Sequence, residues 1–181
     1  MMGPFKKILS AGMALCLLVC IGCSDNPALR LRYEAEKKLA QAERALSRAQ
    51  ISPQLTTPEM VTEIREAFSE AIDFSYDALG QTSPSASPVE YRELQHIAFV
   101  ATSHLSKLLY AERRYDEAIE ALSHLLDQPD LEPDKVLATR INLGRALQSS
   151  GDWDSALVVY NSSLTEFYPP MDNSGEVLLA L

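Results

Sequence analysis

The feature that most constrains this chain is an internal repeat between residues 105 and 169. Small, apolar and aromatic positions recur at a shift of 38 residues, the separation between Tyr115 and Trp153. A fixed period in this range is typical of stacked helical repeats. The first copy holds Leu105, Ser106, Leu109, Arg113, Tyr115, Ala118, Leu122 and Leu125, and the second holds Leu143, Gly144, Leu147, Gly151, Trp153, Ala156, Tyr160 and Ser163.

The spacing inside each copy predicts two antiparallel helices. In the second copy, Leu143 and Leu147 are four residues apart, and so are Ala156 and Tyr160. Residues four apart lie on one face of a helix, so each pair would face the partner helix.

Small residues in the second copy predict how closely the helices approach. Gly144 and Ala156 leave room for a close helix contact, and Gly151 can adopt the left-handed conformation that ends a helix. We expect Trp153 and Tyr160 to fill the seam beside the small residues.

The second copy contains the motifs Leu-Gly-x-x-Leu, Gly-Asp-Trp and Ala-x-x-x-Tyr, followed by Pro169. This pattern resembles the tetratricopeptide repeat, well over residues 137–170 and less well over 101–134. The resemblance implies a right-handed array of helix pairs that binds other proteins. The sequence also departs from the family: Arg140 and Thr102 replace an aromatic residue, and Ser106 and Arg113 replace glycines. The loop 127–134 lengthens the period beyond the family's ~34 residues. The alternative is two unrelated helical hairpins in a bundle.

The start of the chain has the pattern of an export signal. Lys6 and Lys7 precede an apolar run over residues 8–21, which is too short for a comfortable transmembrane helix of about 20 apolar residues. The sequence Cys-Ile-Gly-Cys that ends at Cys23 resembles the lipobox of bacterial lipoproteins, which implies a lipid anchor on Cys23. Ser24 after it resembles an outer-membrane sorting signal. The alternative is an ordinary signal peptide.

The predicted cleavage decides the cysteine content and the charge. Only Cys23 would remain, and a single cysteine forms no internal disulfide. Lys6 and Lys7 would leave with residues 1–22, so that 14 basic and 25 acidic residues give the mature chain a net charge of −11. An acidic body repels nucleic acid and anionic lipid, so we expect a protein that projects into the periplasm from a bacterial envelope membrane.

The mature chain reads as all-α, with few β-branched runs and no alternating segments. After a tether at 23–27, residues 28–80 predict a helical hairpin that Gly80 ends. Its first helix carries an alanine-rich stripe that would pack as a repeat helix or, alternatively, seam a coiled coil. Thr57 is a predicted helix cap, and Ser87 with Glu90 forms a predicted capping box.

The second half of the mature chain holds the repeats. The segment 81–87 is a predicted linker, and 88–170 holds two tetratricopeptide-like helix pairs. Residues 171–181 predict the start of a further repeat helix, from which we expect the natural protein to continue.

The sequence offers little catalytic chemistry. His96, His104 and His124 lack metal-ligand spacing, so we expect surface or boundary positions for them. The acidic loop of Asp127, Asp130, Glu132 and Asp134 lacks the pattern of an EF-hand, and its acids would instead cap the next helix. We therefore expect no catalytic residue, no metal, no cofactor and no small-molecule substrate.

The resemblance implies a binding groove along the first helix of each pair. Carried over residue by residue, its positions are Val100, Ser103, Lys107, Tyr110, Ala138, Ile141, Arg145 and Gln148. Lys107 and Arg145 occupy equivalent places and could hold a carboxylate or an acidic peptide; the alternative is two solvated side chains.

Two classes of function follow from the sequence. One is a membrane-anchored envelope lipoprotein that acts as an adaptor for a protein or peptide partner. The other is the docking arm of a larger enzyme or secretion component whose other domain lies beyond residue 181. A third possibility is a self-associating structural lipoprotein.

Overall fold

The computed structural model describes residues 26–167, which form α-helices and one short 3-10 helix, and no strand occurs in this range. The elements in chain order are α2 (Pro27–Ile51), η1 (Pro53–Leu55), α3 (Pro58–Gln81), α4 (Pro88–Ala111), α5 (Tyr115–Leu126), α6 (Pro133–Ser150) and α7 (Trp153–Phe167).

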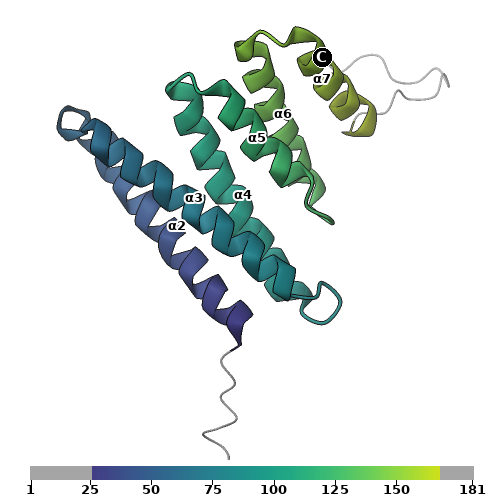
Figure 1. Cartoon of the computed structure of the whole chain (residues 1–181). Coiled ribbons are helices and arrows are strands. Elements are labelled where there is room, and N and C mark those ends of the chain that lie inside the picture. Colours follow the sequence, from purple (N-terminus) through teal and green to yellow (C-terminus); the bar gives the residue numbers. More distant parts are fainter. Residues whose placement is uncertain (1–25, 168–181) are drawn as a thin grey trace, which may run out of the picture.

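The helices pack as three neighbouring antiparallel pairs: α2 with α3, α4 with α5, and α6 with α7 (Figure 1). Each pair contacts the next, through α3 with α4 and through α5 with α6. The first helices also touch one another, α2 with α4 and α4 with α6, so they form one continuous side of the array. The predicted all-α fold of stacked helix pairs is therefore confirmed.

Of three local signals for helix ends, only the cap at Thr57 forms as predicted. The side chain of Thr57 accepts a hydrogen bond from the backbone N–H of Met60 at 3.3 Å, as a cap should. Ser87 precedes α4 without such a bond, so the predicted capping box does not form. Gly80 is not the helix end either: α3 continues to Gln81, and Gly80 has no left-handed backbone.

The two repeat turns have the same backbone geometry, 38 residues apart. Gly151 ends α6 with φ +96°, and the N–H of Asp152 donates to the carbonyl of Leu147 at 2.9 Å. After α4, Arg113 has φ +60°, and the N–H of Arg114 donates to the carbonyl of Leu109 at 2.9 Å. This pairing pattern is that of a Schellman turn, which favours glycine at the left-handed residue. Arg113 adopts the same conformation despite its Cβ.

The close approach of α6 and α7 depends on Gly144. A Cβ at Gly144 would lie 2.6 Å from Cζ of Tyr160, inside van der Waals contact. The equivalent positions of the earlier repeat hold Ser106 and Leu122, both buried. The seam between α6 and α7 therefore combines glycine with tyrosine, whereas the seam between α4 and α5 combines the slightly larger serine with leucine.

The prediction that Trp153 fills this seam is wrong. Its side chain is 58% exposed, whereas Tyr160 does pack into the core. At the equivalent place in the earlier pair, Tyr115 packs edge-on against Tyr110 with ring centroids 5.3 Å apart. The residue 38 positions after Tyr110 is Gln148, so the position equivalent to Tyr110 offers Trp153 no aromatic ring.

The first helix pair joins the same core as the repeats. Ala35 and Ala42 of α2 are fully buried, so the alanine stripe packs as a repeat helix and not as a coiled-coil seam. Phe68 of α3 is also fully buried. One apolar cluster continues from Ala42 through Phe68 to Ala156 of α7, which ties all three pairs together.

Several predictions fall outside the described residues. They concern the signal segment at 1–22, the lipid anchor at Cys23, the beginning of the tether, and the predicted helix at 171–181. Within residues 26–167, no helix is long and apolar enough to span a membrane.

Candidate functional site

The predicted groove positions lie on α4 and α6, the first helices of the two repeats. Three of them, Lys107, Tyr110 and Arg145, line a single pocket of about 380 Å³ between the two pairs. The structure therefore brings together residues that are up to 38 positions apart in the chain. The other lining residues are Ser106, Ala118, Leu122, Asn142 and Ala146.

The pocket has an apolar base and a basic rim. Ala118, Leu122 and Ala146 are each 1% exposed and belong to the core. Lys107 and Arg145 are exposed, and neither takes part in an ion pair within residues 26–167. Among residues 26–167, two cations thus lie beside an apolar surface without forming an ion pair.

Tyr110 joins the two repeats at this pocket. Its hydroxyl and that of Ser149 in α6 are hydrogen-bonded at 2.8 Å, and its ring packs edge-on against Tyr115. The side chain is still 44% exposed. Tyr110 is thus held in place and presents part of its ring to a ligand.

The remaining five predicted positions do not line this pocket. Val100, Ser103 and Ala138 are half-buried, and Ile141 and Gln148 are exposed. They lie along the same two helices as the pocket residues, but they do not line the pocket itself. Their part in a longer groove therefore stays a prediction.

Sequence reasoning missed Asn142 and the pocket base. Asn142 lies three residues before Arg145, so the helix places both on one face, and this spacing could have identified it. An amide beside two cations adds a donor and an acceptor for a peptide backbone. Ala118 and Leu122 come from α5, and no motif in α4 or α6 pointed to them.

The histidines lie where the sequence predicted, at the surface or the core boundary. His96 is exposed, and His124 places its ring edge-on to Tyr76, with centroids 4.4 Å apart. His104 stacks on Phe68 at 5.2 Å. Burial, and secondly the charge of Lys107, lower the pKa of His104, while Glu43 opposes them.

The acidic loop before α6 does not cap that helix as predicted. Glu132 stands at the cap position without a side-chain capping bond, and its carboxylate pairs with Lys135 at 2.9 Å. Within residues 26–167, no three His, Cys, Asp or Glu side chains are grouped as a metal site would require.

Comparison with known families gives a match to part of the chain. The model of the tetratricopeptide repeat matches residues 98–165, from the middle of α4 nearly to the end of α7. No curated protein matches the chain. The matched residues lie in α4 to α7, two of the three stacked helix pairs, and they include the pocket. Residues 98–165 are therefore similar to the tetratricopeptide repeat, a module that binds other proteins.

Proposed function

We propose that this protein is a membrane-anchored adaptor of the bacterial cell envelope that binds an acidic segment of a partner protein in the pocket between α4 and α6. The observation that carries the proposal is the placement of Lys107 and Arg145 at the rim of one apolar-based pocket.

The charge around the pocket supports an acidic ligand. The whole chain has a formal net charge of −9, so two exposed cations that form no ion pair within residues 26–167 do not simply reflect a basic surface. Guanidinium and ammonium groups bind carboxylates by charge-assisted hydrogen bonds, which are stronger than neutral ones. The base formed by Ala118 and Leu122 adds a place for an apolar side chain next to the carboxylate.

The membrane part of the proposal rests on the first 23 residues of the sequence. A basic start, a short apolar run and the lipobox-like sequence that ends at Cys23 support export and acylation. Lipidation with more than one acyl chain would anchor the protein stably. The start of α2 at Pro27 leaves a short tether between the anchor and the folded body.

Binding would be tested with fluorescent acidic peptides that carry one apolar residue beside paired carboxylates. We expect the variant with both Lys107→Ala and Arg145→Ala to bind about 10-fold or more weakly, because each charge-assisted bond contributes about 1 kcal/mol or more. The matched control replaces two exposed cations of α2, Arg44→Ala with Arg48→Ala, which lie away from the pocket. Equal weakening by both double variants would indicate general charge attraction and would refute the pocket.

The anchor would be tested by fractionation of cells that express the full chain or Cys23→Ala. We expect the native protein in the membrane fraction, with an intact mass that includes acyl chains. A native chain whose mass shows an unmodified Cys23 would refute lipidation and leave the pocket untouched.

A further inference from the structure

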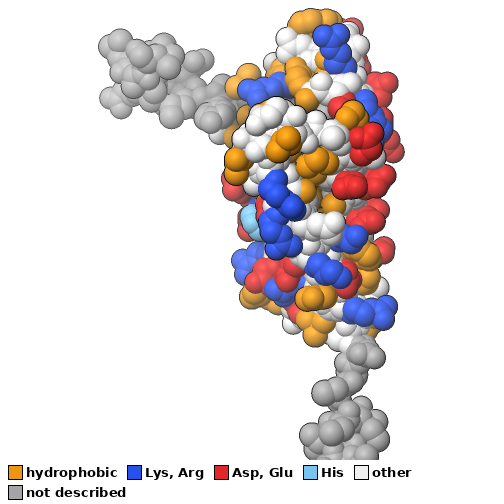
Figure 2. All heavy atoms as spheres, turned by 90° about the vertical axis from the view of Figure 1, so that its left-hand side faces the viewer, with side chains coloured by type: hydrophobic (Ala, Val, Ile, Leu, Met, Phe, Trp, Pro, Cys, Tyr) orange, Lys and Arg blue, Asp and Glu red, His pale blue; other side chains and the backbone are white. Residues whose placement is uncertain are grey.

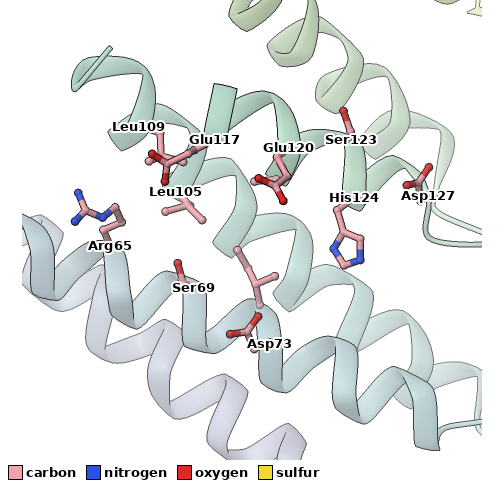
Figure 3. A pocket seen from close by; sticks show the side chains of 12 residues that line it. Arg65, Ser69, Asp73, Leu105, Leu109, Glu117, Glu120, Ser123, His124 and Asp127 are labelled. Atoms are coloured by element: carbon pink, nitrogen blue, oxygen red, sulfur yellow. The ribbon is translucent and has the colours of Figure 1, made fainter. Parts of the chain in front are cut away.

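A second groove lies between α3 and α5, the second helices of two successive pairs. It has a volume of about 680 Å³ and is lined by side chains of α3, α4 and α5 (Figure 3). None of the residues that line the pocket of Lys107 and Arg145 takes part in it. The two surfaces are therefore separate.

The floor of this groove is apolar. Leu105 and Leu109 of α4 and Ile72 of α3 reach it, and each is less than 10% exposed to solvent. Ala121 of α5 adds a small, half-buried side chain beside them. A ligand side chain without charge can therefore rest on the groove floor and bury apolar surface there.

Each wall of the groove carries an acidic side chain, and Arg65 also lines the α3 side. Figure 3 shows Asp73 on α3 and Glu120 on α5 turned toward the space between the two helices. Asp127 lies at one end of α5, and Glu117 lies toward the other. Among these four, only Glu117 has a basic partner within residues 26–167, namely Arg114.

The basic residues nearest to the groove do not neutralise it. Arg65 is paired with Glu112 at 2.7 Å. His124 contacts the ring of Tyr76 edge-on. Burial, and then repulsion from Asp77 and Glu70, raise the pKa of Asp73, while His124 lowers it slightly. Burial is the larger cause, and the carboxylates of Asp77 and Glu70 add negative charge beside Asp73.

Acidic side chains also gather on the surface at a larger scale. Figure 2 shows Asp and Glu side chains grouped along the right-hand edge of that view, with Lys and Arg side chains running down its middle. A surface with segregated charge attracts partners of opposite charge and speeds their association.

We propose that the groove between α3 and α5 docks a basic, amphipathic segment of a second protein. One apolar side chain of this segment lies on Ile72, Leu105 and Leu109. Lysine or arginine side chains that flank it reach Asp73 on one wall and Glu120 on the other. Nucleic acid is excluded by like charge.

The probe is a synthetic amphipathic peptide of about 15 residues, with leucine at helical spacing and lysine or arginine on both sides of that stripe. Its binding to the full chain is measured by fluorescence anisotropy at low salt. We expect the double variant Asp73→Asn with Glu120→Gln to bind about 10-fold more weakly, because two ion pairs at partly exposed sites are lost. Both substitutions keep the side-chain shape, and circular dichroism checks that the helices remain.

Three controls test whether the peptide occupies this groove and uses both its floor and its walls. The variant Lys107→Ala with Arg145→Ala should bind this peptide as the native protein does, because its changes lie in the other pocket. A peptide with serine in place of leucine should bind clearly less well, because it cannot use the floor. Binding of the leucine peptide should weaken as salt is raised, since screening shortens the reach of exposed charges.

Unchanged affinity of the Asp73/Glu120 variant would overturn the proposal. Equal affinity for the leucine and serine peptides would also overturn it, since the surface would then be only an acidic patch. Loss of binding in the Lys107/Arg145 variant would place the peptide in the other pocket. The adaptor proposal is tested with acidic peptides, so it can fail or hold independently of these results.

Discussion

The turn at Arg113 allows the energetics of the repeat to be tested at a single backbone position. Arg113 has φ +60°, and Gly151 has φ +96° at the equivalent place. The left-handed conformation costs a residue with a Cβ about 1–2 kcal/mol. Glycine avoids this cost but loses about 0.5–1 kcal/mol more backbone entropy on folding. The difference predicts that Arg113→Gly raises the free energy of unfolding by about 0.5–1 kcal/mol.

The matched control is Arg113→Ala, which removes the same charge but keeps the Cβ. We expect Arg113→Gly to be more stable than Arg113→Ala in urea titrations followed by circular dichroism. In thermal melts, its melting temperature should be higher by about 2–4 °C for each kcal/mol of added stability. The reciprocal change, Gly151→Ala, should lower stability by a similar amount, since a Cβ there meets no atom within 4 Å and only the backbone conformation resists it. If alanine proved more stable than glycine at position 113, as in an ordinary helical site, the left-handed turn would be refuted.

Three further predictions concern the core and its pH dependence. Gly144→Ser should lower the free energy of unfolding by about 1–3 kcal/mol, because the added side chain would overlap Tyr160. Adding Tyr160→Leu recreates the seam of the earlier repeat and should restore part of the loss in the urea midpoint. If the effects of the two changes were strictly additive, the predicted overlap would be refuted. Phe68→Ala should cost about 3–5 kcal/mol by the same titration, since the ring is fully buried, and a loss below about 1 kcal/mol would refute its core role. The pKa of His104 is lowered from its ordinary value of 6.5, so its favourable contribution is complete above pH 6.5 and is lost as the pH falls through the folded-state pKa. His104→Gln should therefore show a smaller fall in stability from neutral pH to about pH 5 than the native protein, and an equal fall would exclude His104 as its source.

The sequence by itself determined the local structure of the repeats. Helical spacing predicted two helix pairs within residues 88–170, where the structure has α4 to α7, and Gly151 predicted a left-handed turn. These features depend on residues within one or two turns of each other, so the order of residue types is sufficient to predict them. The same spacing placed Lys107 and Arg145 at equivalent sites, and both line one pocket.

Only the tertiary structure decided what surrounds each side chain. It left Trp153 exposed, and it held Arg113 in a left-handed conformation in a turn closed by the bond from the N–H of Arg114 to the carbonyl of Leu109. It also set Asp73 opposite Glu120 across an apolar floor, although these residues belong to different helix pairs. Burial and electrostatic potential depend on all neighbours in space, and a pattern within one helix carries no information about the helix packed against it.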